Sequence, residues 1–502
     1  MPRMAASHHT SAGSARLLPV ERWLLWVLLV VVIGFGGLVL WRSAFAKLRM
    51  TDAGAFFRAA WAIRADPERL YSVTDDRGWA YLYPPLTAIL FWPLADPPAG
   101  EDRAGYLPYA LSVGIWFVLS VGLLGLCCEL LARSVARGMG WTVARGSRLW
   151  WALRVVPVLI CLPDIGSTLS RGQVDLLMLA GVSLWMHSLG SARRLRGGLW
   201  LGLAGVVKLM PLFLVLLPLC RREGRTLAGI GLGVLLGVVV VPCAVLGPAT
   251  AYELTQTWAG QAGALAMESH AGGEAGVLEG ASGSHAVGAD DHPAEALEDA
   301  LAVANPMGND NHSLVAILHR WMMIPQTLER LRGELSPAEV ERMQDAGVVT
   351  GVVAAGVCLV LAGLACWPVR STGAGVGAGG TGVDAGAMGL LLSAGCLLVV
   401  MTMITPGGHL HYFVFRLPLV AVLVGLAIGP GGRLRLSAGW LVLFGAVVVL
   451  GVLPKLPGLG PLRYLGLAAV GMWLLLGVGL VRLWRMGGAG PQPRTMGALR
   501  MP

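Results

Sequence analysis

Long runs of apolar residues alternate with short polar segments along most of this chain. The first run, Leu24 to Trp41, has eighteen consecutive residues without a charge, which is about the helix length needed to cross roughly 30 Å of hydrocarbon. It is too long for a signal-peptide core, so we interpret it as a retained span. Nine further runs lie near 106–131, 150–169, 173–189, 226–247, 347–367, 386–404, 412–428, 437–453 and 464–482. The pattern predicts an all-α polytopic membrane protein with about ten transmembrane helices.

Segment 197–219 departs from this alternation. It is apolar, but the basic sequence RRLR precedes it and RREGR follows it, and one crossing would place one of these clusters outside the cytoplasm, against the positive-inside rule. Lys208 lies in the middle of the segment, and Pro211, which lacks a backbone donor, follows it. We therefore predict a broken, re-entrant hairpin with Lys208 near its tip, buried in protein or facing a cavity.

Composition supports a membrane location and changes the meaning of the net charge. The chain is 55% hydrophobic and 13% charged, with a formal net charge of +9. When the N-terminus is placed in the cytoplasm, lysine and arginine concentrate in the cytoplasmic segments. The positive charge therefore orients the chain in the plasma (inner) membrane, and no nucleic-acid partner is predicted.

Two predicted extracytoplasmic loops, 42–105 and 248–346, are long enough to carry function. The first begins near Asp52 in the sequence TDAGAFFRAAWAI and continues into an aromatic, proline-rich stretch. The second has eight carboxylates and no lysine or arginine between residues 267 and 300, so we predict a disordered or loosely ordered acidic insertion there. The glycine-rich sequence 371–389 is typical of a flexible cytoplasmic linker.

Ionisable residues in or beside apolar runs cost free energy, so each is a functional candidate. These candidates are Asp164, Arg171, Asp175, Lys208, His409 and His411. Together with Asp52, they all lie in, or can reach, the extracytoplasmic half of the membrane. Such a set supplies a base that takes a proton from a hydroxyl and cations that stabilise a phosphate. The chain offers no P-loop, no GxSxG and no DxD in a plausible soluble domain. The eight cysteines lack metal-ligand spacing, so no metal or cofactor is predicted.

Simpler interpretations of these residues stay open at this point. Asp52 could cap a helix, and Lys208 could pair with a buried carboxylate inside the bundle. His409 and His411 are two residues apart and would point in nearly opposite directions on a helix. Only one would then face a site, unless the preceding PGG sequence holds both in a loop. Tyr and Trp residues within 71–92 suit the membrane interface as headgroup anchors.

Several sequences, in order, resemble those of the family 87 glycosyltransferases, membrane enzymes of the GT-C class. These are TDAGAFFRAAWAI followed by YLYPPLTAILFWPL, then RGQVDLLMLAGVSLW, GLWLGLAGVVKLMPLFLVLLPL, NDNHSLVAILHRW and TPGGHLHYFVFRLPLV. The resemblance implies a GT-C-like helical bundle whose extracytoplasmic loops form the site. It also implies transfer of a sugar, most often mannose, from a polyprenyl-phosphate donor to a glycolipid or glycan hydroxyl at the outer membrane face.

The resemblance also implies roles for individual residues. Asp52 is then the general base of an inverting displacement, and Lys208 is a contact of the donor phosphate. Further substrate-binding candidates are Tyr83, Gln173, Asp175, Asn311 and one or both of His409 and His411. Asp175 stands where the family usually has asparagine. The implied partners are the lipid-linked donor, the lipid or glycan acceptor and the surrounding membrane lipids.

The implied domain organisation is one catalytic transmembrane module followed by additional helices. We expect cytoplasmic tails at 1–22 and 486–502, the module at 23–430 and C-terminal transmembrane helices at 431–485. A lipid or sugar transporter or flippase is the main alternative. The chain has loops of unequal length and no evident internal repeat, and both features favour the transferase over the transporter. An inactive scaffold of the same fold is a third possibility, and the presence of Asp52 argues against it.

Overall fold

The computed structural model describes most of the chain as helix. The described residues are 16–49, 51–189, 191–271, 311–323, 337–367, 384–405, 408–429, 436–456 and 458–487. Most of the predicted acidic insertion and of the predicted glycine-rich linker lies outside these ranges, as do residues 1–15 and 488–502. Within the described ranges, extended pairing is limited to isolated β-bridges. The predicted all-α class is confirmed.

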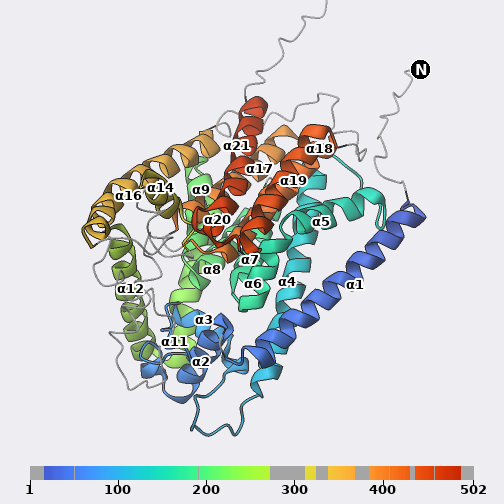
Figure 1. Cartoon of the computed structure of the whole chain (residues 1–502). Helices are drawn as coiled ribbons and strands as arrows, with labels where there is room; N and C mark the ends of the chain where they lie inside the picture. The colour runs from blue at the N-terminus through green and yellow to red at the C-terminus, as the bar shows by residue number, and fades with distance from the viewer. Residues whose placement is uncertain are drawn as a thin grey trace, which may run out of the picture.

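Eight described helices are long and apolar enough to cross a membrane, or nine if one bent pair counts as a span. Their helical segments are α1 (Pro19–Trp41), α4 (Tyr109–Gly138), α10 (Gly224–Leu235) continued by α11 (Val241–Leu246), α16 (Pro337–Cys366), α17 (Ala385–Ile404), α18 (Leu417–Ile428), α19 (Ala438–Val452) and α21 (Leu467–Gly487). Figure 1 shows them as one bundle with α1 along its edge. The polytopic arrangement is therefore confirmed.

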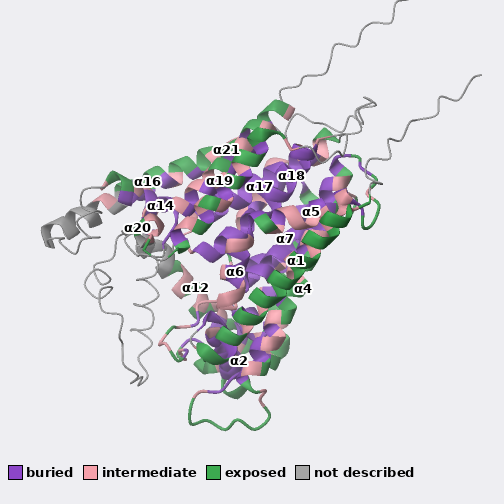
Figure 2. Ribbon diagram, turned by 45° about the vertical axis from the view of Figure 1, so that its right-hand side comes forward, coloured by how far each residue is buried: buried purple, intermediate pink, exposed green. Residues whose placement is uncertain are grey.

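The bundle is built around α17 and α18. In each of these spans, 89% of the most apolar window is buried, whereas the corresponding value for α1 is 6%. Figure 2 shows this contrast, with buried residues along α17 and α18 and exposed residues along α1. A helix that is apolar all round and exposed to this extent has the surface expected for contact with lipid.

Two of the predicted crossings differ from straight spans. Run 150–169 forms α5 (Arg148–Ile160) and α6 (Leu162–Arg171), which meet at 68°. Pro157 and Pro163 remove backbone donors around the bend. Run 173–189 forms α7 (Asp175–Ser188), which has 14 residues and is therefore about 21 Å long, too short for a full crossing. The prediction of two regular spans here is wrong in detail.

The re-entrant hairpin has the shape predicted from its flanking charges. Helix α8 (Arg194–Val207) ends at Lys208, whose backbone is extended, and the chain returns through η4 (Met210–Val215) and α9 (Leu216–Cys220). Arg194 and Arg221, one at each end of the segment, both contact Glu223 Oε1, at 3.7 and 2.8 Å. Both basic ends therefore lie on one side of the bundle, and Lys208 lies at the reversal.

Glycines permit the close contact between α8 and α10. A Cβ atom on Gly198 would lie 2.1 Å from the carbonyl oxygen of Thr226, and one on Gly229 would lie 2.2 Å from that of Leu195. Both obstructing atoms belong to the backbone of the facing helix. A side chain at either position therefore requires the helices to separate.

We expect Gly198→Ala to destabilise the protein by about 1–3 kcal/mol, the usual cost of overpacking a well-packed core. Thermal unfolding in detergent measures the effect. Gly231→Ala in α10 is the matched control, because a Cβ there meets no atom within 4 Å. Equal melting temperatures for the two variants would contradict the close contact.

The predicted loops contain helices of their own. Segment 42–105 forms α2 (Asp52–Ala65) and α3 (Pro85–Leu90) at one end of the bundle, at the bottom of Figure 1, and α3 packs against both α2 and α11. Segment 248–346 forms α12 (Pro248–Ala271), α14 (Leu314–Met322) and the start of α16. The described parts of segment 248–346 are therefore helical, and its extracytoplasmic location stays a prediction.

Candidate active site

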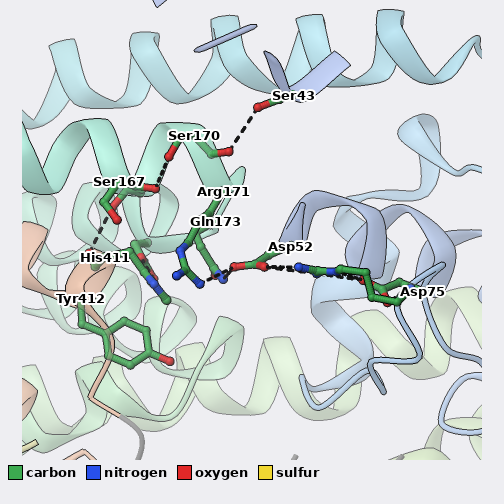
Figure 3. A network of polar contacts seen from close by, with 12 residues as sticks. Ser43, Asp52, Asp75, Ser167, Ser170, Arg171, Gln173, His411 and Tyr412 are labelled. Carbon is green, nitrogen blue, oxygen red and sulfur yellow. Dashed lines mark hydrogen bonds and ion pairs between the residues drawn. The ribbon is translucent and has the colours of Figure 1, made fainter. Parts of the chain in front are cut away.

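Asp52 is the first residue of α2, and its carboxylate faces side chains from two other segments. Oδ1 accepts hydrogen bonds from both terminal nitrogens of Arg77, each at 3.2 Å, and Oδ2 accepts one from Gln173 Nε2 at 2.6 Å. Arg171 Nη1 lies 3.6 Å from the same Oδ2. Thr51 occupies the N-cap position. Asp52 is thus the centre of a polar network, shown in Figure 3, rather than a simple helix cap.

A short turn around Asp75 holds Arg77 towards Asp52. Asp75 Oδ1 accepts from the backbone N–H groups of Arg77 and Trp79, at 2.8 and 3.0 Å, and Oδ2 accepts from Arg77 Nε at 3.0 Å. Gly78 closes the turn with φ +83°, a left-handed conformation that favours glycine. The turn therefore fixes both the backbone and the guanidinium of Arg77.

Burial changes the titration of this turn. Burial raises the pKa of Asp75, against the opposing effects of Arg77 and the two backbone donors. Burial alone would lower the pKa of Arg77, but the carboxylates of Asp75 and Asp52 together raise it. Arg77 is therefore a permanent cation beside Asp52.

A cavity of about 130 Å³ opens beside the Asp52 network. Its lining comes from α2, the Asp75 turn, the end of α6 and the segment before α18. The lining residues are Asp52, Ala55, Phe56, Arg77, Trp79, Ala80, Leu82, Tyr83, Arg171, Gln173, His409, His411 and Tyr412. Of the candidates identified from the sequence, the cavity thus gathers Asp52, Tyr83, Arg171, Gln173 and both histidines.

Both histidines line the cavity because the backbone between them is not α-helical. His409 has extended backbone angles and precedes the 3₁₀ segment η8 (Leu410–Arg416), in which His411 lies. Their rings are stacked, with centroids 5.3 Å apart and planes 13° apart. Thr168 of α6 donates a hydrogen bond to the carbonyl of His411 at 3.0 Å, which fixes η8 against the bend. Both histidines therefore reach the cavity through an extended residue and a 3₁₀ turn.

Lys208 and Asp175 lie behind the cavity wall. Lys208 Nζ donates to the hydroxyls of Tyr412 and Tyr83, at 2.7 and 3.3 Å, and both tyrosines line the cavity. Asp175 is completely buried, with Oδ2 3.9 Å from His411 Nε2. The carboxylate of Asp164 pairs with Arg416 at 2.7 Å. The hydrogen bonds of Lys208 therefore go to the hydroxyls of two tyrosines, and Asp164 pairs with Arg416 instead.

Asn311 fixes a loop of the site without lining the cavity. Its Oδ1 accepts from the backbone N–H groups of Gly408 and Ser313, each at 3.0 Å. Gly408 directly precedes His409, so this amide links the start of α14 to the histidine segment. These hydrogen bonds support the loop, and a substrate contact at Asn311 stays a prediction.

Arg77, Trp79 and Tyr412 also line the cavity, although the sequence alone did not predict them as site residues. Arg77 lies in a polar loop, where a charged side chain pays no free-energy cost for burial in the membrane. A pattern of charges inside apolar runs therefore does not indicate it. The available signal was the spacing of Asp75, Arg77 and Gly78, which is typical of a tight turn with a side-chain acceptor. Tyr412 carries no charge and lies next to His411, within the motif already noted.

Part of the chain is similar to known proteins. The model of glycosyltransferase family 87 matches residues 81–289, which confirms the resemblance over that segment. A polyprenol-phosphate-mannose-dependent alpha-(1-2)-phosphatidylinositol mannoside mannosyltransferase from Mycobacterium tuberculosis (strain H37Rv) is 32% identical over 169 residues. That match covers 32% of this chain and 37% of the relative's length. No solved structure matches the chain significantly.

Proposed function

We propose that this chain is a membrane glycosyltransferase that moves a sugar, most readily mannose, from a polyprenyl-phosphate donor to a hydroxyl of a glycolipid or glycan acceptor. The observation that carries the proposal is a buried carboxylate, Asp52, held beside Arg77 and Arg171 in a cavity at the loop end of an apolar bundle. The family 87 match and the mannosyltransferase relative support the same class of reaction.

The mechanism requires one base and one anion-binding group. Asp52 takes the proton of the acceptor hydroxyl as the hydroxyl oxygen attacks the anomeric carbon and the bond from that carbon to the phosphate oxygen breaks. One such displacement inverts the anomeric centre. The phosphate leaves as an anion, which a guanidinium stabilises through charge-assisted hydrogen bonds.

Among the cations of the site, Arg171 is the best contact for the donor phosphate. Its side chain is 31% exposed and lies 3.6 Å from Asp52, whereas the side chain of Arg77 is 18% exposed and also bonds to Asp75. A phosphate that engages Arg171 would weaken its contact with Oδ2 of Asp52. Donor binding would in this way make the carboxylate a stronger base when the acceptor arrives.

The site is proposed to face the extracytoplasmic side of the plasma membrane. Lysine and arginine are frequent in the predicted cytoplasmic segments, and by the positive-inside rule the loop end that carries Asp52 is then outside. There the phosphate of a lipid-linked donor lies at the headgroup level. Phe56, Trp79 and Leu82 supply apolar walls to the cavity.

The direct test is transfer of radiolabelled mannose to membrane lipids by the purified protein in nanodiscs. We expect product from polyprenyl-phosphate mannose and none from GDP-mannose. Product from a polyprenyl-phosphate pentose alone would keep the reaction class and overturn mannose. Absence of transfer from every lipid-linked donor, or movement of intact donor across proteoliposomes, would favour the transporter alternative and overturn the proposal.

A further inference from the structure

The ammonium of Lys208 is separated from the cavity by two aromatic rings. Nζ lies 4.2 Å from the centroid of the Tyr412 ring and 5.1 Å from that of Tyr83. Both rings line the cavity, and Lys208 is not among the lining residues. Two cation–π contacts together with two hydrogen bonds hold the charge in place. A ligand in the cavity would therefore meet the phenols before the ammonium.

The direction of these hydrogen bonds determines what the phenols offer to a ligand. An ammonium can only donate, and a phenol has one proton to donate. Because Tyr412 and Tyr83 accept from Lys208, each keeps its own O–H for another acceptor. The hydroxyl of Tyr83 lies 3.4 Å from Gln173 Oε1. Figure 3 shows Tyr412 beside His411 near Arg171, Gln173 and Asp52.

We propose that Lys208 acts on the site through Tyr412, whose hydroxyl donates a hydrogen bond to the phosphate of the departing polyprenyl phosphate. This inference rests on the proposed function and names a further group of the same site. The ammonium polarises the phenol, and such chains strengthen the terminal hydrogen bond. Tyr412 keeps its proton throughout, so the contact stabilises charge without transferring a proton. Lys208 is then a positioning residue, and Tyr412 is the group that touches the substrate.

This arrangement explains why a lysine is present at the reversal of the hairpin. The extended backbone at Lys208 interrupts the helix, and the side chain can then reach η8, which carries Tyr412. Thr87 of α3 donates to the carbonyl of Val207 at 3.0 Å, so the tip is also fixed to the segment that carries Tyr83. The hairpin thus delivers a charge to the wall shared by the two tyrosines.

The first test is Tyr412→Phe, which removes one oxygen and keeps the ring. We expect kcat to fall by about 10- to 100-fold, the range for a hydrogen bond to a charged group, with little change in the KM of the donor. Binding of sugar-free polyprenyl phosphate, the product, should weaken by about 10-fold. Tyr81→Phe is the matched control, because the Tyr81 hydroxyl bonds to the Pro84 carbonyl and Tyr81 does not line the cavity.

A double-mutant cycle tests the relay itself. Lys208→Met should lower kcat in the wild-type background and should cost several-fold less in the Tyr412→Phe background. Lys208→Arg should recover part of the loss. Additive losses, or normal turnover and normal product binding in Tyr412→Phe, would overturn the inference while the proposed function stands. If the wild type transfers no sugar, the proposed function fails, and binding of polyprenyl phosphate to wild type and Tyr412→Phe still decides whether Tyr412 contacts the phosphate.

Discussion

Replacing Asp52 by asparagine should lower kcat for sugar transfer by about 10²–10⁴-fold, the contribution usual for general base catalysis. Asparagine keeps the size of the side chain and one oxygen that can accept from Arg77, but its amide cannot take a proton at neutral pH. The initial rate of mannose transfer from polyprenyl-phosphate mannose measures the effect. Binding of the donor should change much less than turnover, because the base acts on the acceptor.

Asp102→Asn is the matched control for this prediction. Asp102 lies in an exposed part of the same segment, where its carboxylate accepts from the backbone N–H of Ala104 at 2.9 Å. It does not line the cavity. Retention of more than a tenth of wild-type turnover by a folded Asp52→Asn variant would exclude Asp52 as the base, and His411 would become the next candidate.

Replacing Arg171 by glutamine should raise the KM of the polyprenyl-phosphate donor and lower kcat/KM by about 10- to 100-fold. The expected size follows from loss of charge-assisted hydrogen bonds to phosphate. Steady-state kinetics at saturating acceptor separate the two parameters. An unchanged KM for the donor would show that the phosphate binds elsewhere in the cavity.

Arg103→Gln is the control for Arg171. Its guanidinium pairs with Asp96 in the same segment, its side chain is 45% exposed and it does not line the cavity. A general loss of positive charge at the loop end would weaken binding of an anionic donor in both variants. A loss confined to Arg171→Gln identifies a specific contact. High salt should reduce the effect of a general loss of positive charge more than the effect of losing a specific contact.

The apolar periodicity was sufficient to predict the class of the fold. Length and hydropathy predicted most spans, since each must cover the same thickness of hydrocarbon. The bend between α5 and α6 was not predicted, because residues 150–169 are mostly apolar, with Arg154 and Asp164 as the ionisable exceptions, and prolines also occur in membrane-spanning helices. Run 173–189 was predicted as a crossing for the same reason. Its helix, α7, has 14 residues and is shorter than the run.

The site was predicted less completely than the fold. Asp52, His409 and His411 were found because ionisable groups near apolar runs have a free-energy cost that selects for a use. Arg77 was not found, because its role depends on a turn in a polar segment. Lys208 was found, but its partners are contributed by residues 125 and 204 positions away. Only the three-dimensional structure brings such distant side chains together.

The hairpin around Lys208 has a consequence for how the remaining helices are oriented. Since Arg194 and Arg221 meet the same glutamate, the segment between them leaves the parity of membrane crossings unchanged. Reporter enzymes fused on either side of the hairpin should therefore signal the same compartment. A change of length at the tip would leave the direction of α10 and all later helices unaltered. The chain can thus carry an ammonium held by two phenols on an element whose insertion does not decide its topology.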